Sequence, residues 1–290
     1  MAKFVDFTST ENNKYVPADL NTQLIDLYTK VAPELSIVLP WATTAGSAYT
    51  FNRLADIGSG TTVAADGTIT AGTAISSTQV ALPIVSYVGT HSIPNRDLRA
   101  AGAQGAAVKK DLAVQAGAKQ AIYAFQAALV SALATHTGTT ATSQAVSYTG
   151  SDVFANVDAI LAKLHKKQGA FLMGNAAVEN VLKKAMRGAG GITTIELNGV
   201  YFLAYDGVPF VRNDFISTST TPSPDTSPLY AVVGDEMDGM CAVEPESGRF
   251  TFQEVPVEVG KDAWTSIVTL DAALPIHSLR SVSSTVVPLA

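Results

Sequence analysis

Few side chains in this sequence could do chemistry, and they do not gather into a recognisable site. The chain has one cysteine, Cys241, and four histidines, His91, His136, His165 and His277. No two histidines stand four residues apart, and none has a second metal ligand beside it at a useful spacing. Cys241 has no base near it in the sequence, so we expect a small core residue. The pattern predicts neither a metal centre nor a nucleophile paired with a base.

A group of carboxylates in the C-terminal third is the strongest candidate for an ion site. Asp235, Glu236 and Asp238 lie close together, and Glu244 and Glu246 follow. A calcium loop needs carboxylates at alternating positions, a central glycine and a distal glutamate. That order does not occur here. We therefore predict a solvated turn and no metal ligands.

Glycine-rich and basic segments carry no further motif. Residues 58–60 and 188–191 lack the glycine spacing of dinucleotide and phosphate loops, and no G-x-S-x-G segment occurs. Short basic groups are expected on helices, as solvated faces or as ion-pair partners of other subunits. These groups are residues 109–110, 166–167 and 183–187. We expect no catalytic residues, no cofactor and no enzyme activity, so a hydrolase or transferase is the least favoured function class.

The low charge of the chain is its most unusual global property. Charged residues make up 15% of the 290 residues, against about 25% in typical soluble domains. A weakly charged exterior is a poor solubility strategy for a lone monomer, so we expect other copies to cover much of it. The net charge of −6 disfavours binding to nucleic acid through phosphate neutralisation. No apolar run is long enough to span a membrane, and residues 1–20 lack a signal-peptide core.

The longest periodic stretch, residues 93–135, predicts a long helix. Pro94, Asn95 and Asp97 supply a start signal, and a threonine-rich segment after it supplies a stop. A helix over residues 104–134 would be about 45 Å long at about 1.5 Å per residue. Its apolar stripe should pack on sheet from the C-terminal third of the chain. The stripe consists of Val114, Ala118, Ile122, Phe125, Leu129 and Leu133.

Residues 45–90 alternate like a long β-hairpin. Apolar positions mark an outgoing and a returning strand, and Asp66-Gly67 between them is a turn signal. The tip is rich in glycine, threonine, alanine and serine, so it cannot form a core of its own. It is either mobile or lies against something else. The apolar positions are Tyr49, Phe51 and Leu54 going out, and Ile75, Val80, Leu82, Ile84, Val85 and Val88 returning.

The remaining elements predict an α+β protein with mostly antiparallel sheet. A short amphipathic helix should end near Pro33 and be followed by a strand over residues 36–41. Further helices should begin at Ser151 or Asp152 and at Asn175. Strands are expected over residues 171–173, 193–196, 200–204, 209–212, 229–233, 240–243, 250–259 and 263–287.

The order of these elements resembles the major capsid proteins of tailed bacteriophages, which have the Hong Kong 97-type fold. An arm, an apolar-poor hairpin and a long helix precede a compact α/β region and long strands. The most specific segment is residues 171–216, where FLMGNAAVENVLKKAM is followed by GVPFVRND. Residues 81–98, ALPIVSYVGTHSIPNRDL, resemble the strand that returns from the hairpin into the long helix. The resemblance covers nearly the whole chain.

This resemblance implies a shell protein with four parts. Such a chain would assemble as hexamers and pentamers into the icosahedral head around the double-stranded DNA of a tailed phage. It would be assembled in the host cytoplasm, reside in the virion and contact no membrane. Scaffolding, portal and decoration proteins would be separate partners, and the DNA would be enclosed without sequence-specific binding. The parts are an N-terminal arm (1–44), an extended hairpin loop (45–90), a peripheral domain with a spine helix (91–144 and 246–275) and an axial domain (145–245 and 276–290).

In this fold the hairpin would lie over a neighbouring subunit. The intersubunit contacts that the resemblance implies are Tyr15, Thr61, Thr62, Asp66, Gly67 and Thr68. An encapsulin-like bacterial compartment around an enzyme cargo is the alternative shell. The polar arm, which has no amphipathic cargo-docking helix, speaks against that alternative.

Overall fold

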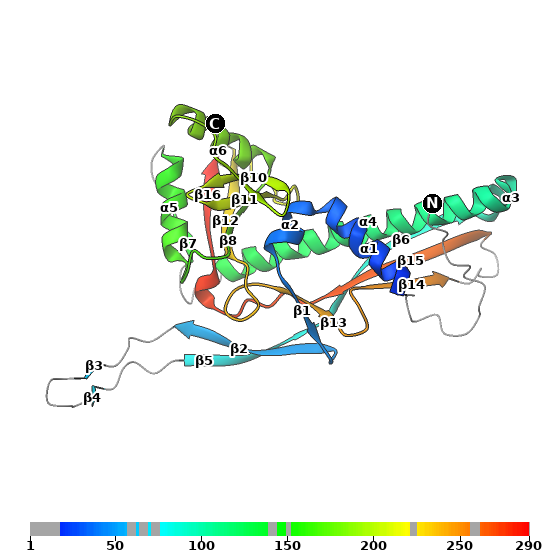
Figure 1. Cartoon of the computed structure of the whole chain (residues 1–290), viewed down its shortest axis with the longest axis horizontal. Helices are drawn as coiled ribbons and strands as arrows, with labels where there is room; N and C mark the ends of the chain where they lie inside the picture. Colours follow the sequence, from blue (N-terminus) through cyan, green and yellow to red (C-terminus); the bar gives the residue numbers. More distant parts are fainter. Residues whose placement is uncertain are drawn as a thin grey trace.

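A computed structural model shows an elongated α+β molecule, the class that the sequence predicts (Figure 1). A large sheet with two helices and a small sheet share one long helix, and a β-hairpin projects from the region between them. The residues that the structure describes are 18–56, 62–63, 69–70, 76–138, 144–148, 152–220, 225–255 and 262–289.

The long helix α4 spans Gly102–Gly138 and has 37 residues, which makes it about 55 Å long at about 1.5 Å per residue. It includes residues 104–134 of the predicted stretch 93–135, and every residue of the predicted stripe is buried. The predicted start signal belongs to a separate short helix, α3 (Asn95–Ala100). The break falls at Gly102, whose φ of +67° is the left-handed conformation that glycine tolerates.

The small sheet lies against α4 and consists of three antiparallel strands. They are β14 (Phe250–Val255), β15 (Ala263–Ala272) and β6 (Val85–Pro94), in the order β14-β15-β6. Alternate residues of β15 are buried, as expected for a sheet with one covered face. The helix approaches β6 most closely where Gly89 meets Gly117, since a Cβ added at Gly89 would overlap the Gly117 carbonyl. The predicted packing of the helix on C-terminal sheet is confirmed by β15.

The large sheet has seven strands in the order β7-β16-β12-β8-β11-β10-β9. The strands β8–β11 and β7–β16 pair in parallel, and the other neighbours are antiparallel. Their bounds are β7 (Ala145–Val146), β8 (Ala170–Gly174), β9 (Thr194–Leu197), β10 (Val200–Tyr205), β11 (Val208–Arg212), β12 (Thr226–Val233) and β16 (Val282–Pro288). All of β8 is buried, so it forms the centre of this body.

Local signals position the helices and turns of the large sheet. Helix α5 (Val153–Lys163) begins after Asp152, whose side chain accepts from two backbone N–H groups. Helix α6 (Ala176–Gly188) begins after Asn175, which caps the Val178 N–H. Asn198 and Asp206 have positive φ and precede glycines in the turns that flank β10. These caps and turns agree with the sequence prediction.

The N-terminal segment differs from the prediction in one element. Helix α1 (Ala18–Val31) is present as expected, but residues 36–38, the first half of the strand predicted over residues 36–41, belong to helix α2 (Pro33–Val38). Proline presets the φ of a first helical turn, and an acidic residue there favours the helix dipole; Pro33 and Glu34 supply both. Strand β1 (Trp41–Thr44) follows and pairs in parallel with β13 (Ala242–Pro245).

An aromatic cluster ties this segment to α4. The ring of Phe125, which is fully buried, stacks on Trp41 with a centroid distance of 5.5 Å. Tyr87 and Tyr28 contact the same ring edge-on at 5.6 and 6.3 Å. The guanidinium of Arg249 lies 3.5 Å from the Trp41 ring centroid. The cluster therefore joins α1, β1, α4, β6 and the start of β14.

The projecting hairpin is confirmed but is shorter than predicted. Its strands are β2 (Ala48–Asp56) and β5 (Ser76–Pro83), and β3 (Thr62–Val63) pairs with β4 (Ile69–Thr70) farther out. The predicted return through Val85 and Val88 is wrong, because β6 pairs with β15 instead. Pro83 has no N–H with which to continue the ladder, and the Ile84 N–H closes the hairpin on the Ser47 carbonyl.

The predicted C-terminal run over residues 263–287 is divided. Strand β15 ends at Ala272, a connection leads to the short 3-10 helix η1 (Leu279–Ser281), and β16 follows. Proline at 275 and the buried His277 and Ser278 lie in this connection. It carries the chain from the small sheet to the large one, which a single strand could not do.

Candidate assembly surface

The root of the hairpin, which we define as Tyr49, Phe51, Arg53 and His277, is held inside the chain. The Tyr49 hydroxyl lies 3.2 Å from Nε2 of His277, and the Phe51 ring contacts the imidazole at a centroid distance of 4.7 Å. Arg53 Nε donates to the Ile276 carbonyl at 3.1 Å. Tyr49 and His277 are 228 residues apart in sequence, and no sequence pattern pairs them. The root was therefore missed by the sequence prediction.

The predicted contact residues lie farther out on the hairpin or in the arm. Thr62 belongs to β3, where its backbone pairs with Thr70. The other five, Tyr15, Thr61, Asp66, Gly67 and Thr68, are outside the described residues. Their contacts with another subunit stay a prediction.

The small sheet presents an open face away from α4. The open face consists of the outward residues of the three strands, and among these only Asp271 carries a charge. Neighbouring hydroxyls hydrogen-bond across it, with Ser92 and Thr265 2.8 Å apart and Thr251 bonded to Thr269. The face is made of Ser86, Val88, Thr90, Ser92, Thr251, Gln253, Val255, Thr265, Ile267, Thr269 and Asp271. Such a surface offers many hydrogen-bonding groups and little charge to a covering partner.

Several large apolar side chains are exposed on the same molecule. Val85 and Val88 are about half exposed on β6, an edge strand among the described residues. Val108 and Leu112 stand one turn apart on α4, each 58% exposed. On the large sheet, Tyr201 of β10 is 70% exposed. Exposed apolar side chains at both ends of an elongated subunit are typical of a protein that packs against copies of itself.

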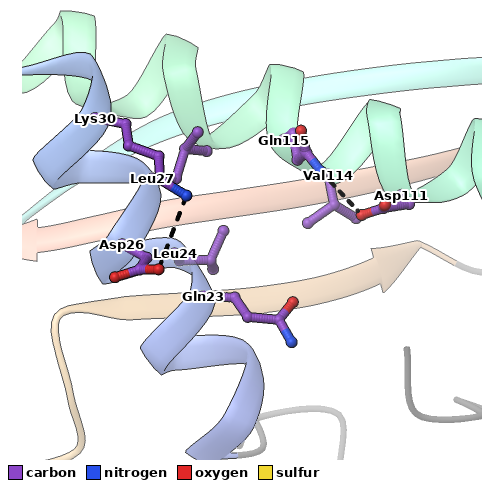
Figure 2. A pocket seen from close by; sticks show the side chains of 8 residues that line it. All are labelled: Gln23, Leu24, Asp26, Leu27, Lys30, Asp111, Val114 and Gln115. Atoms are coloured by element: carbon purple, nitrogen blue, oxygen red, sulfur yellow. Dashed lines mark hydrogen bonds and ion pairs between the residues drawn. The ribbon is translucent and has the colours of Figure 1, made fainter. Parts of the chain in front are cut away.

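A shallow groove separates α1 from α4 (Figure 2). Leu24, Leu27 and Val114 form its apolar part, and Asp26 and Asp111 lie on its rim. Asp26 pairs with Lys30 at 3.9 Å, while Asp111 accepts a hydrogen bond from Gln115 at 3.3 Å. Burial raises the pKa of Asp111, and the Gln115 bond partly offsets this. The residues that line the groove include no cysteine, serine or histidine.

The acidic group at residues 235–238 forms an ionic turn. Lys166 Nζ donates to Asp235 at 2.7 Å and to Asp238 at 2.5 Å, so Lys166 is an intrachain partner and not the predicted solvated or intersubunit group. The hydrogen bond from Lys166, followed by the backbone N–H of Met237, lowers the pKa of Asp235 to about 2. The turn is confirmed, but two of its carboxylates, Asp235 and Asp238, are paired within the chain.

The remaining chemistry candidates do not converge. Within the described ranges, no three His, Cys, Asp or Glu side chains are grouped so that they could hold a metal ion. Cys241 is buried, and this burial, with Glu236 and Asp235 nearby, raises its thiol pKa to about 12. A thiol with so high a pKa is a poor nucleophile at neutral pH. No helix in the described residues is long and apolar enough to cross a membrane.

Comparisons with known proteins detect only structural similarity. No protein-family model and no curated protein matches the sequence. The alignment with the SrpI encapsulin of Synechococcus elongatus PCC 7942 covers 98% of this chain and 93% of the encapsulin chain, with 13% identity and a TM-score of 0.64. The alignment with the capsid of a native GTA particle covers 98% of this chain and 95% of the capsid chain, with 10% identity and a TM-score of 0.61. The alignment with the capsid of cyanophage P-SCSP1u covers 98% of this chain and 92% of the capsid chain, with 11% identity and a TM-score of 0.52. Because almost the full length of the chain matches the folds of these shell subunits, the chain has the Hong Kong 97-type capsid fold.

Proposed function

We propose that this protein is the shell-forming subunit of a tailed-phage head. It assembles through hexamers and pentamers into an icosahedral shell that encloses double-stranded DNA. The observation that carries the proposal is the match of almost the whole chain to the shell subunits of solved capsids. Scaffolding, portal and decoration proteins are separate partners, and the chain has no enzyme activity of its own.

The distribution of surface supports this function. A two-stranded hairpin is marginally stable alone in water, yet here β2 and β5 form a separate two-stranded sheet, and β3 and β4 lie farther out (Figure 1). The open face of the small sheet is uncovered by other described elements and nearly uncharged. A head-to-tail contact between these two surfaces would be heterologous, the kind that closes rings or extends lattices. We propose that Thr61, Thr62, Asp66, Gly67, Thr68 and Tyr15 take part in it.

The four parts expected from the sequence become proposed domains. The large sheet with α5 and α6 would be the axial domain, and the small sheet with α4 the peripheral domain. Because β6 pairs with β15, we propose that residues 85–94 belong to the peripheral domain. The hairpin loop would then end at Pro83 instead of residue 90.

The second candidate is an encapsulin-like compartment. The specific observation in its favour is the match to the SrpI encapsulin over 98% of this chain. Both candidates predict a closed shell of this one chain, and they differ in the content of the shell. A phage head contains DNA and carries a tail, whereas a compartment contains a cargo protein.

The experiment is expression of the chain followed by electron microscopy and sedimentation. Closed or sheet-like particles of hexamers and pentamers are expected, and a stable monomer of about 30 kDa at high concentration would refute shell formation. Particles isolated from the natural source separate the two candidates. Tailed particles with packaged DNA support the phage head, and DNA-free particles with a co-purifying enzyme support the compartment.

A further inference from the structure

Three basic or titratable side chains from distant parts of the chain converge at the root of the hairpin. Arg53 comes from β2, His136 from the last turn of α4, and His277 from the connection between β15 and η1. Each is bound to a backbone carbonyl. Arg53 Nε lies 3.1 Å from the Ile276 oxygen, His136 Nε2 3.1 Å from the Leu279 oxygen, and His277 Nδ1 3.2 Å from the Gly239 oxygen. The hairpin, the spine helix and the connection between the sheets therefore meet in one polar joint.

The hydrogen bonds of His277 are complete when its ring is neutral. A carbonyl oxygen can only accept, so Nδ1 carries the proton toward Gly239. The bare Nε2 then accepts from the Tyr49 hydroxyl at 3.2 Å, which ties the ring to the hairpin. His277 is 4% exposed, and Phe51 lies against its ring. A second proton would place a charge in this buried site and turn the acceptor for Tyr49 into a donor.

The charges around the joint oppose a second proton on either ring. Burial lowers the pKa of His136 and of His277, and the positive charge of Arg53 lowers both further. The hydrogen bonds to the backbone carbonyls raise the pKa values of both rings, and the nearby Asp235 and Asp238 also raise that of His277. Those two carboxylates are already bound by Lys166, which reduces their effect on the ring.

We propose that Arg53, His136 and His277 form an acid-sensitive latch that holds the root of the hairpin to the body while both rings are neutral and releases it when they are protonated. The use of such a latch in assembly rests on the proposed shell function, because the direction of the hairpin would decide which surface of a neighbour it reaches. The latch itself is a property of the single chain.

The sign of the pH dependence follows from the two states of the root. In a released root both rings are exposed and have ordinary pKa values near 6.5. In the held root the pKa values of both rings are lower. The held state is therefore favoured above the ordinary pKa. As the pH falls from about 6.5 toward the lowered values, release is favoured by at most about tenfold per pH unit for each histidine. Below the lowered pKa values, the ratio of released to held root no longer changes with pH.

Hydrogen exchange on the unassembled full chain tests the latch. Exchange is compared at about pH 7.5 and about pH 5.5, with times scaled for the intrinsic rate. We expect the protection factor of the paired root segments, residues 48–53 and 79–83, to fall at the lower pH, by at most about tenfold for each histidine. Protection in the buried part of α4 should change much less. Unchanged root protection would overturn the proposal.

Variants assign the effect to the two rings. The double variant His136→Gln, His277→Gln should show equal root protection at both pH values. His91→Gln is the matched control, since His91 is an exposed histidine of β6, and it should respond to acid as the natural chain does. An acid response of the double variant equal to that of the natural chain contradicts the latch.

A second measurement applies if the double variant does not fold. In Arg53→Gln the histidine resonances are titrated by NMR, and the apparent pKa values of His136 and His277 should rise because the neighbouring charge is gone. Unchanged values would overturn the proposal. Electron microscopy at neutral pH keeps the two proposals apart. A chain with the acid response that forms no particles would refute the shell function alone, and particles without the acid response would refute the latch alone.

Discussion

Replacing Phe125 with alanine tests whether the aromatic cluster is the main joint between the N-terminal segment and the spine helix. The side chain is fully buried, stacks on Trp41 and meets Tyr87 and Tyr28 edge-on. Truncation of a fully buried phenylalanine costs about 3–5 kcal/mol from lost burial and the cavity that remains. Since domains are stable by only about 5–15 kcal/mol, we expect a large loss of soluble protein as well as a lower unfolding free energy.

Tyr123→Ala is the matched control for this substitution. Tyr123 lies two residues before Phe125 on the same helix, is 46% exposed and has an aromatic partner, Phe215, at 5.7 Å. Loss of an exposed aromatic pair should cost about 0.5–1.5 kcal/mol. Urea unfolding of both variants, followed by tryptophan fluorescence, gives the two values. A Phe125→Ala protein as stable as Tyr123→Ala would show that the cluster does not hold the helix, and that the buried face is wrongly assigned.

Three further changes test other joints of the fold. Gly89→Ala should strongly destabilise the chain, because its Cβ would overlap the backbone of α4, whereas Gly138→Ala has open space and should be nearly neutral; thermal unfolding compares the two. Arg249→Met should lower the unfolding free energy in urea by about 3–5 kcal/mol, because the Glu244 carboxylate would lose its charge partner. This carboxylate accepts from the guanidinium at 2.8 Å, and its side chain is only 19% exposed. A double variant, Arg249→Met with Glu244→Gln, that is no more stable than the single variant would contradict this. Deletion of residues 61–70 should leave the circular dichroism and unfolding of the subunit unchanged and abolish regular particles in the microscope, and normal particles from this chain would exclude the hairpin tip from assembly.

Several features of the protein follow from local sequence alone. The long helix could be predicted because its apolar residues recur at helical spacing and no proline interrupts them. The caps at Asp152 and Asn175 and the two glycine turns beside β10 depend on neighbours within a few residues. The hairpin was visible as alternating apolar positions around a tip without large side chains. The resemblance of the whole chain to capsid proteins also rests on the order of such local elements.

The boundaries and joints were decided by tertiary structure. Residues 36–41 contain β-branched and apolar types that suit a strand, but a proline-started helix buries Leu35 and Leu39 on the body instead. Val85 and Val88 continue the alternation of the hairpin, yet β15, almost two hundred residues later, provides the partner that takes them. Alternation says that a segment is extended; it does not say which strand it pairs with.

The root of the hairpin shows most clearly which features local sequence predicts and which depend on tertiary structure. The sequence by itself predicted the hairpin, because alternating apolar positions around a turn signal depend only on residue type and spacing. The pairing of Tyr49 with His277, the approach of Arg53 to the Ile276 carbonyl and the capture of Asp235 by Lys166 have no local signature. These contacts arise only when the folded chain brings residues from distant segments together, and buried groups such as the His277 imidazole must then find a hydrogen-bond partner there.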